Sequence, residues 1–507
     1  MKEPHRNKSL LLSFLMFSSV MIGLVGLMPT AMATNETSNG TISGTEVWSG
    51  SHTLTGTVIV ATGANLIVQP GTTVTFPNGT FLDVRGGLCA GDVACGANGM
   101  ASNSSRIVFN WQDPANASAT GSCYGIFSGN HWNQDPSCNE GILLRSTVDI
   151  GATKLNHVSI TNAYGIPRWV SDISEVRYGA LVAEGASPTM TGLKFEGINT
   201  TSLLILDLAR PDIVGGEFTV GDDATSLIGS AIQAYGAGSA VQPLSIIAPV
   251  FTGTSNGCGQ SDDGRHVLWV EESYVDVQNA VIASGDYGIR LDNSAGLVTS
   301  STIDTTCNGI DVNNKKTAGN NVAYKLTVAN NKITTDERSP LTAFNLAWVD
   351  FNNNVIDGAS DGSGIQISKS MVNINGGTIG PIGGWNGIWS IGESDVRVEN
   401  VTIQGTTKEP IVAGEYHFGD QGWSVPGPSE NRMYVANSII DSAGGECTSL
   451  KAWGGDFSCP AVHAFRSSMT LLNNDITIGG GGDGIRALGA LLDVRNNVIN
   501  STGTGAM

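Results

Sequence analysis

The string SDDGRH at residues 261–266 places two carboxylates, a guanidinium and an imidazole close together in the chain. These groups can do acid–base chemistry, because hydrolysis of a glycosidic bond needs two carboxyl groups roughly 5 to 10 Å apart, one of them held protonated. Asp262 and Asp263 are the candidate pair, with Arg265 and His266 beside them. Adjacent residues of a strand point to opposite faces, however, and adjacent carboxylates in a loop are more often solvated or bound to calcium. The string therefore supplies four catalytic candidates and no complete motif.

A second group of candidates consists of aromatic and histidine side chains in or beside segments that interrupt a repeated pattern, near residues 161–178, 252–265, 404–430 and 441–460. Sugar faces stack on aromatic rings while sugar hydroxyls bond to acids, so a groove that carries both is suited to a long glycan. The alternative is that these rings only pack each loop against the body of the protein. The candidate ligand-binding residues are Trp385, Trp389, Tyr416, His417, Trp423 and Trp453.

Calcium is the one metal that the sequence suggests, at Asp-rich turns such as residues 357–362, where carboxylates and carbonyls could converge. Asp and Gly are also ordinary turn residues, and the nonapeptide calcium repeat is missing. We therefore expect no required cofactor and leave the metal sites unassigned.

The composition indicates the kind of elements that must position these residues. The chain has 507 residues, 66 of them Gly, with 40% hydrophobic and 14% charged residues, so it can bury a large core. No stretch after the N-terminus shows sustained 3.6-residue apolar periodicity, which predicts an all-β protein. Asp and Glu number 45 against 26 Lys and Arg, without a basic cluster beyond the N-terminus, so we expect no nucleic-acid partner.

The N-terminus resembles a secretory signal. Lys2, Arg6 and Lys8 precede an apolar run, and the small residues that follow predict cleavage after Ala33. Removing residues 1–33 takes a net charge of +2 from −19 and leaves −21. An uncleaved membrane anchor is the alternative. With cleavage, the protein is expected to be secreted or at the cell surface, without an integral membrane span.

Eight cysteines fall into four neighbouring sets, as expected of disulfides in an exported protein. Zinc is the competing interpretation, but no Cys-x-x-Cys pair or His cluster accompanies them. The expected pairs are Cys89 with Cys95, Cys123 with Cys138, Cys258 with Cys307, and Cys447 with Cys459. Sequons that would permit N-glycosylation, and so make the chain a glycoprotein in a suitable source, stand at Asn35, Asn39, Asn78, Asn103, Asn116, Asn199, Asn400 and Asn500.

A six-residue pattern recurs through the chain: an apolar residue, a variable one, often Asn or Gly, two more residues, and Ile or Phe. Strong copies are VRNNVI (494–499), FNNNVI (351–356) and VANNKI (328–333), and their commonest spacing is 23 residues. Such a period matches one turn of a β-solenoid of short strands and tight bends. The third residues of the copies are His157, Gly192, Gly215, Ala248, Asn279, Ser300, Asn330, Asn353, Gly376, Asn400, Asn437, Asn473 and Asn496.

A second landmark lies 12 to 13 residues before the third residue of a copy. It is a Gly followed by an apolar strand, as at Gly288, Gly364, Gly387 and Gly484. Two short alternating strands per coil follow from it. Stacking of coils predicts an interior aliphatic column of Ile403, Ile440, Ile476 and Ile499. Asn at a bend adopts left-handed geometry and can pass amide hydrogen bonds to the next coil. We therefore interpret Asn473 and Asn496 as structural, and we expect Asn400 to be enclosed.

With these repeats the sequence resembles the right-handed parallel β-helix proteins, a broad class of secreted solenoids that includes pectate lyases and polygalacturonases. The resemblance covers about residues 50–507, and the segment Thr57–Leu88 is similar to the opening coils of exported members. It divides the chain into a signal peptide (1–33), a linker and cap (34–56), opening coils with disulfide-tied loops (57–150) and the main β-helix (151–507). Because a full repeat closes at Ile499, we expect a missing C-terminal module or end-to-end association.

The resemblance implies a fold and no particular chemistry. The polygalacturonase motifs Asn-Thr-Asp, Asp-Asp, Gly-His-Gly and Arg-Ile-Lys do not occur in order on successive coils. Pectate-lyase chemistry needs a basic residue, and Arg290 and Arg486 stand at outward strand positions beside Asp292 and Asp483, without a matching motif. We expect a non-enzymatic binding, adhesive or structural protein that contacts glycans. The alternative is a polysaccharide lyase or glycoside hydrolase that acts on an acidic polysaccharide.

Overall fold

The computed structural model describes residues 37–112, 139–171, 174–198, 200–220, 229–253, 257–258, 266–314, 324–414, 431–442, 459–479 and 482–502. The chain divides into two compact units, residues 1–36 and 37–507. The signal-peptide prediction lies outside the described residues. In the part of the chain that is described, no helix is long and apolar enough to cross a membrane.

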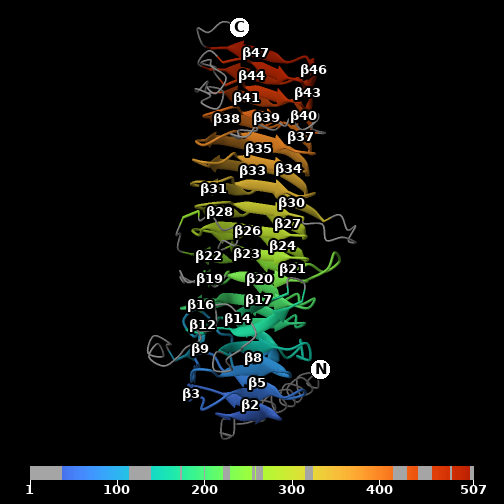
Figure 1. The fold of residues 1–507 in the computed structure, drawn as a ribbon. Helices are drawn as coiled ribbons and strands as arrows, with labels where there is room; N and C mark the ends of the chain where they lie inside the picture. Colours follow the sequence, from blue (N-terminus) through green and yellow to red (C-terminus); the bar gives the residue numbers. More distant parts are fainter. Residues whose placement is uncertain are drawn as a thin grey trace, which may run out of the picture. The chain divides into compact units, whose positions relative to one another are not determined.

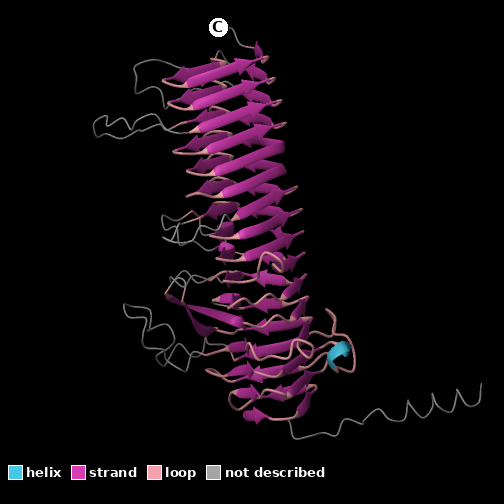
Figure 2. Ribbon diagram, turned by 90° about the vertical axis from the view of Figure 1, so that its right-hand side faces the viewer, coloured by secondary structure: helices cyan, strands magenta, loops and turns pink. Residues whose placement is uncertain are grey.

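The second unit is built from two sheets of stacked, almost entirely parallel strands (Figures 1 and 2). Within the described ranges, sheet A has 17 strands and sheet B has 30. The strands of sheet A are β1 (Gly40–Ile42), β4 (Val58–Val60), β7 (Phe81–Val84), β10 (Gly141–Leu144), β13 (Ile166–Val170), β14 (Glu175–Glu184), β17 (Thr201–Leu206), β20 (Ile232–Tyr235), β23 (His266–Glu271), β26 (Tyr287–Asp292), β29 (Ile310–Asn313), β32 (Leu341–Phe344), β34 (Ile365–Ser368), β36 (Ile388–Ile391), β39 (Ile411–Ala413), β42 (Val462–Phe465) and β45 (Ile485–Leu488).

Sheet B takes most of its strands in pairs, with one tight bend inside each pair. Its strands are β2 (Thr45–Trp48), β3 (Ser51–Thr53), β5 (Asn65–Val68), β6 (Thr73–Phe76), β8 (Gly87–Ala90), β9 (Ile107–Trp111), β11 (Lys154–Asn156), β12 (Val158–Thr161), β15 (Thr189–Thr191), β16 (Lys194–Glu196), β18 (Asp212–Val214), β19 (Glu217–Thr219), β21 (Leu244–Ile247), β22 (Val250–Thr252), β24 (Tyr274–Gln278), β25 (Val281–Ile282), β27 (Ala295–Thr299), β28 (Thr302–Thr305), β30 (Lys325–Ala329), β31 (Lys332–Thr335), β33 (Trp348–Gly358), β35 (Met371–Ile382), β37 (Asp395–Glu399), β38 (Thr402–Thr406), β40 (Arg432–Ala436), β41 (Ile439–Ser442), β43 (Ser468–Leu472), β44 (Asp475–Ile478), β46 (Leu491–Arg495) and β47 (Val498–Ser501). A short 3₁₀ turn, η1 (Val93–Cys95), adds the helical element of the described residues.

One coil therefore contributes one strand to sheet A and two to sheet B. In a typical coil, β26 lies in sheet A and β27 and β28 lie in sheet B, and each pairs in parallel with its equivalent one coil later, β29, β30 and β31. Parallel strands joined by such crossovers form a right-handed parallel β-helix, which confirms the predicted fold. The predicted two strands per coil become three, because each sequence repeat spans the bend between the two sheet B strands. The first coil, β1–β3, already lies within residues 34–56.

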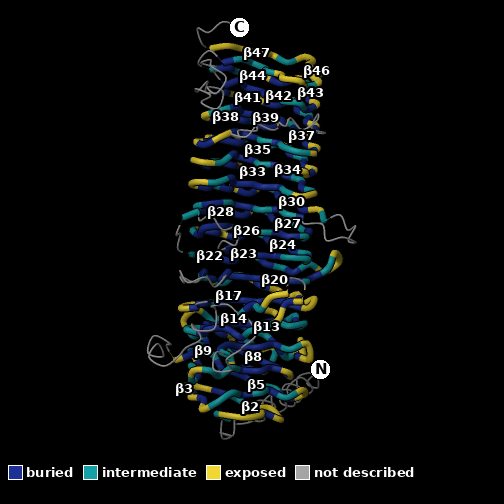
Figure 3. The backbone as a smooth tube through the Cα atoms, in the orientation of Figure 1, coloured by how far each residue is buried: buried dark blue, intermediate teal, exposed yellow. Residues whose placement is uncertain are grey.

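The interior consists of columns of equivalent apolar side chains. Figure 3 shows that buried residues recur from coil to coil. Ile403, Ile440, Ile476 and Ile499 occupy consecutive register positions, as predicted, and Ile499 on the last described coil is 45% exposed. Aromatic residues form a similar column nearer the N-terminus, where Phe195, Phe218 and Phe251 stack with ring centroids 5.2 and 5.4 Å apart. Full burial of each such side chain contributes about 1.5–3 kcal/mol, so the stacked repeats themselves stabilise the fold.

The predicted bend register is confirmed at every copy. All thirteen third-position residues have positive φ, between 49° at His157 and 68° at Gly376. The left-handed conformation turns the chain sharply between the two sheet B strands and explains the preference for Asn and Gly. These side chains face outward, however, and Asn400 is exposed, so the expectation that it is enclosed was wrong.

The buried polar ladder lies one residue further along. Asn331 accepts a hydrogen bond from the Ser301 amide at 2.8 Å, and its Nδ2 donates to the carbonyl of Val298 at 3.0 Å and to Oδ1 of Asn354 at 2.9 Å. Asn354 continues the ladder by donating to the Val328 carbonyl at 2.9 Å. The ladder satisfies backbone groups at the bend that the sheets leave unpaired.

Two of the four predicted disulfides lie wholly within the described residues, and both are formed. Cys89–Cys95 and Cys258–Cys307 join Cα atoms 5.5 and 5.4 Å apart. Cys459 is also disulfide-bonded. Cys123, Cys138 and Cys447 lie outside the described residues.

Candidate functional site

The outer face of sheet A is where candidate functional residues can lie, because the inward-facing side chains of its strands pack in the hydrophobic core. Side chains alternate along each strand, so Leu268 and Val270 face the core while Trp269 and Glu271 face outward. Equivalent outward residues stack at about 4.8 Å per coil. One such series, which we name the outer file, contains Leu143, Val182, Leu204, Gln233, Trp269, Arg290, Asp311, Thr342, Gln366, Trp389, Val412, His463 and Arg486.

The N-terminal part of this face is covered by the chain itself. Strand β13 folds back antiparallel to β14, and its Ile166 and Val170 join an apolar cluster with Leu143, Val182 and Leu204 of the outer file. The N-terminal part therefore resembles an extension of the core.

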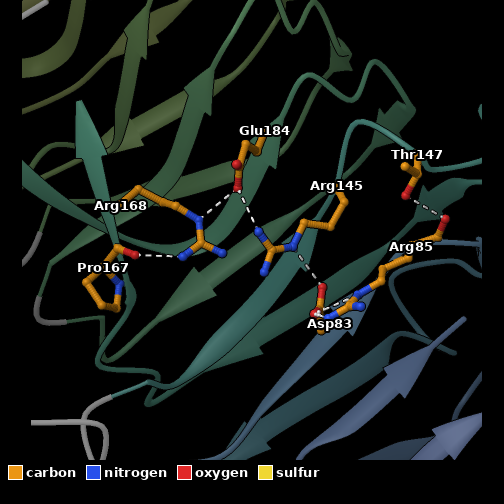
Figure 4. A network of polar contacts seen from close by, with 7 residues as sticks. All are labelled: Asp83, Arg85, Arg145, Thr147, Pro167, Arg168 and Glu184. Carbon is orange, nitrogen blue, oxygen red and sulfur yellow. Dashed lines mark hydrogen bonds and ion pairs between the residues drawn. The ribbon is translucent and has the colours of Figure 1, made fainter. Parts of the chain in front are cut away.

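Beside this cluster, alternating charges tie β7, β10, β13 and β14 together (Figure 4). Asp83 pairs with Arg85 at 2.8 Å and with Arg145 at 3.0 Å, and Glu184 pairs with Arg145 at 3.4 Å and with Arg168 at 2.8 Å. Because every charge in this network has a partner, we assign the network a structural role.

The next coils carry polar and aromatic side chains that we name the Trp269 cluster. Its members are Arg177, Tyr235, His266, Trp269, Glu271, Tyr287, Arg290, Asp292 and Asp311. The guanidinium carbons of Arg177 and Arg290 lie 5.1 and 4.9 Å from the centroid of the Trp269 ring. Nε of Arg177 donates to the Tyr235 hydroxyl at 3.1 Å, which fixes one side of the cluster. Cation–π contacts of this kind become stronger where water is excluded.

Three carboxyl groups of the cluster come from three consecutive coils. Glu271 on β23 lies directly opposite Asp292 on β26, and Asp311 on β29 follows in the outer file. Asp292 forms an ion pair with Nε of Arg290 at 2.8 Å. Asp311 accepts hydrogen bonds from Nδ2 of Asn308 at 2.7 Å and from the Thr342 hydroxyl.

The surroundings disfavour ionisation of two of these carboxyl groups. Desolvation by burial, followed by repulsion from Asp292, raises the pKa of Glu271 from 4.5 to about 7. Burial also raises the pKa of Asp311, although its two hydrogen bonds oppose the shift. A carboxyl group with a pKa near neutrality can either donate or accept a proton, which makes it suitable for acid–base chemistry.

His266, a catalytic candidate from the sequence, lies inside this cluster. Its ring centroid is 4.9 Å from that of Tyr287, and its Nε2 is 3.4 Å from Nη1 of Arg290. Burial lowers the pKa of His266 well below its usual value, so the ring is neutral. Because arginine can only donate, Nε2 accepts and the proton lies on Nδ1. Asp262, Asp263 and Arg265 lie outside the described residues.

A second outward group, five coils along the outer file from Trp269 and so about 24 Å away, contains two predicted ligand-binding residues. Trp385 and Trp389 stack with centroids 5.6 Å apart, and Trp385 is 40% exposed. Nζ of Lys408 lies 4.6 Å from the Trp385 ring, and Nε1 of Trp385 donates to Asp361 at 3.0 Å. The indole pair is therefore held in place by its own coil and its neighbours while one ring stays accessible.

The outer file ends in a buried histidine–carboxylate contact. Nδ1 of His463 is 3.7 Å from Oε1 of Glu409. Burial lowers the pKa of His463 to about 4 and raises that of Glu409. Arg486, on the following coil, pairs with Asp483 through Nε at 2.9 Å.

The loop insertions follow the last Ile or Phe of a repeat and precede the next opening strand, which predicts that they all project from one side, and the structure corrects this prediction. Residues 253–265 and 443–461 run from a sheet B strand to the next sheet A strand, as predicted. Residues 414–431, by contrast, follow the sheet A strand β39 and lead to β40 of sheet B, so they join the coil at a different corner. The short strand Ile411–Ala413 was not recognised in the sequence, and this caused the error. The other predicted ligand residues, Tyr416, His417, Trp423 and Trp453, lie outside the described residues.

Sequence reasoning placed Arg290 beside Asp292 on an outward face, and the structure confirms that position. It missed Trp269, Glu271, Tyr287 and Asp311. The signal that could have found them is the alternation of the sheet A strands, because the residue between two core positions faces outward. Among the described residues, no group of three or more His, Cys, Asp or Glu side chains is placed to hold a metal ion, so calcium stays a prediction.

No protein-family model matches the chain, and no curated protein matches it in sequence. The solved structures with a similar fold include the periplasmic alginate epimerase AlgG, with 10% identity, 89% of this chain and 78% of that chain covered, and a TM-score of 0.36. The A-module of the Azotobacter vinelandii mannuronan C-5 epimerase AlgE6 has 13% identity and a TM-score of 0.30, with 85% of this chain and 91% of that chain covered. Tailspike protein 3 of bacteriophage CBA120 has 10% identity and a TM-score of 0.32, with 92% of this chain and 57% of that chain covered. At these identities the likeness concerns the fold alone, and the topology of its own two sheets makes this chain a parallel β-helix protein.

Proposed function

We propose that the protein is an exported glycan-binding β-helix protein, and that the outer file between Trp269 and Trp389 is its binding face. The observation that carries this proposal is the stacked Trp385–Trp389 pair, with Trp385 40% exposed at one end of the file. Indole faces attract the apolar faces of sugar rings, and they do so at little conformational cost when the rings are already fixed.

The residues between the two ends of this face support the same function. Arg290, Asp311, Thr342 and Gln366 follow one another in register, and they supply donors and acceptors in one line. Polar side chains at a regular spacing of about 4.8 Å can meet the hydroxyl groups of an extended saccharide. Trp269 and Trp389 lie at the two ends of this face, which is about 24 Å long.

The charges favour a neutral glycan over a uronate polymer. Both arginines of the Trp269 cluster are engaged in ion pairs, Arg177 with Glu175 and Arg290 with Asp292. The whole chain carries a net charge of −19. A polyanion would be repelled over long range, and it would find no unpaired guanidinium in this cluster. We therefore propose neutral polysaccharides as the glycans that the protein contacts, and not the acidic polysaccharide of the alternative interpretation as an enzyme.

Export is supported by the disulfides and by the N-terminal sequence. The bonds Cys89–Cys95 and Cys258–Cys307 would be stable in an oxidising compartment. A surface location would bring the outer face of sheet A into contact with extracellular glycans.

A glycan array that contains neutral glycans and uronate polymers tests the proposal. We expect binding to neutral glycans, and the double variant Trp385→Ala/Trp389→Ala should bind at least about tenfold more weakly, a loss of about 1.4 kcal/mol. Trp348→Ala is the matched control, because Trp348 on sheet B also has a lysine amine, Nζ of Lys325, over its ring at 5.0 Å. The proposal fails if no glycan binds, or if the control loses as much affinity as the double variant.

A further inference from the structure

Glu271 and Asp292 are two carboxylic acids in different surroundings on neighbouring strands of sheet A. Their backbones are directly opposite in the β23–β26 pairing, and neighbouring strands lie about 4.8 Å apart. Glu and Asp side chains of different length that extend from these opposed backbones can place their carboxyl groups within the roughly 5 to 10 Å that glycoside hydrolysis uses. Each stands two residues after an outer-file residue of the proposed binding face, Glu271 after Trp269 and Asp292 after Arg290.

The two groups differ in their partners. Asp292 is buried and forms an ion pair with Nε of Arg290 at 2.8 Å, a contact that favours a charged carboxylate. Glu271 makes no ion pair and no side-chain hydrogen bond with another described residue, and it is only partly exposed. Burial raises the pKa of Glu271 to about 7, so this carboxyl group keeps its proton up to near neutral pH. Enzymes divide acid and base roles between two carboxyl groups in this way.

An independent observation indicates a ligand at the same place. Nδ1 of His266 and Nε1 of Trp269 have no hydrogen-bond partner among the described residues, although the two residues are only 2% and 5% exposed. An unsatisfied buried donor costs about 1–3 kcal/mol, so two of them beside paired carboxyl groups require an explanation. Hydroxyl or ring oxygens of a sugar would supply the missing acceptors.

We infer that the Trp269 cluster is the catalytic site of a glycoside hydrolase, with Glu271 as the general acid and Asp292 as the partner carboxylate. This inference rests on the proposed function, because it takes the bound glycan as its substrate. The proton of Glu271 passes to the glycosidic oxygen as the bond between that oxygen and C1 breaks. Asp292 stabilises the positive charge at C1 and accepts a proton from the water that adds its hydroxyl group there. One water is consumed per bond, and the proton on Asp292 returns to Glu271 through solvent.

The other members of the cluster position these groups. Trp269 is held between Arg177 and Arg290 and can present its indole edge to the sugar. Neutral His266 donates from Nδ1, and the face that continues toward Trp389 would hold the rest of the chain. A site with binding surface on one side of the acids should cut within or near the end of a polymer and release a reducing end.

The test uses the full chain, with the neutral polysaccharides that bind on the array as probes and the release of reducing ends as the readout. Glu271→Gln and Asp292→Asn should each lower turnover about 10²–10⁴-fold, while array binding changes less than about threefold. The matched control is Glu399→Gln on sheet B, because Glu399 pairs with Arg397 two residues away at 2.8 Å, the spacing and distance found for Asp292 and Arg290. It should retain full turnover.

A second measurement separates an acid catalyst from a structural glutamate. An aryl glycoside with an acidic phenol as leaving group needs no protonation, so Glu271→Gln should cleave it at nearly the wild-type rate while failing on the natural type of linkage. Wild-type protein that binds neutral glycans and releases no reducing ends overturns this inference and leaves the binding function standing. Absence of glycan binding removes the proposed function and the inference together. Equal losses on both substrates assign Glu271 a structural role and also overturn the inference.

Discussion

Replacing Glu271 by glutamine keeps the shape of the side chain and removes its titration, so it tests the electrostatics of the Trp269 cluster without any substrate. Desolvation is the main cause that raises the pKa of Glu271 to about 7, and the facing charges of Asp292 and Glu272 raise it further while Arg290 and Arg177 lower it. The carboxyl group therefore binds its proton more tightly in the folded chain than in the unfolded chain.

The sign and size of the effect follow by linkage. Since the folded pKa is the higher one, Glu271 contributes its full stabilisation below about pH 4.5, and this contribution is lost as the pH rises through about 7. A shift from 4.5 to about 7 corresponds to at most about 3 kcal/mol at 1.36 kcal/mol per unit. Because the side chain is partly exposed, we expect about 2 kcal/mol after solvent screening.

The assay is chemical unfolding of wild type and Glu271→Gln at several pH values between 4 and 8.5. Titrating groups that do not interact with Glu271 affect both proteins equally, so the difference between the two unfolding free energies reports on Glu271 and its coupling to its neighbours. Between pH 4 and 8.5, we expect the unfolding free energy of wild type to fall by about 2 kcal/mol relative to that of the variant. A difference that is flat within about 0.5 kcal/mol would show that Glu271 is as well solvated in the folded chain as in the unfolded one. The cluster would then lack the environment that our inference requires.

Three further predictions concern the solenoid and are checked by unfolding free energies. Asn331→Ala should cost about 2–4 kcal/mol, because it leaves the Ser301 amide and the Val298 carbonyl without partners, whereas Asn330→Gly at the exposed bend should change little. Phe218→Ala should cost about 3–5 kcal/mol, because it opens a cavity in the middle of a three-ring column. Asp83→Ala should cost about 1–3 kcal/mol, because it leaves Arg85 without this carboxylate and Arg145 with Glu184 alone (Figure 4), and equal stability would show that water already replaces that pairing.

The repeat and its bend could be predicted because they are periodic. Each coil must place an apolar residue under its equivalent and must turn sharply at the same point, so the sequence shows Ile and Asn at fixed spacing. The predicted amide hydrogen bond between third positions is found where Nδ2 of Asn473 donates to Oδ1 of Asn437 at 3.3 Å, but the buried ladder lies one residue further along. A left-handed residue such as Asn330 directs its side chain outward, and the next residue, Asn331, is the one that faces the interior.

The candidate site could be predicted only in part. Arg290 and Asp292 were recognised as outward because the landmark Gly288 precedes them. In the preceding coil Val267 stands at the position equivalent to Gly288, so β23 carried no landmark and its residues Trp269 and Glu271 were missed. The proton affinity of Glu271 was not predictable at all, because it depends on what covers the strand and on a charge one coil away.

Different coils of this molecule show whether the fold needs polar residues in the outer file. On β10, β14 and β17 the file holds Leu143, Val182 and Leu204, which are completely buried beneath the β13 hairpin. The fold therefore accepts apolar residues at these positions. From β23 onward, equivalent positions hold Trp269, Arg290 and Asp311 instead, and the buried donors on His266 and Trp269 reduce stability. Backbone pairing and coil stacking are the same on both stretches, so they do not account for the change. A ligand that satisfies these groups would account for it, and this is why we place the functional site on β23–β36.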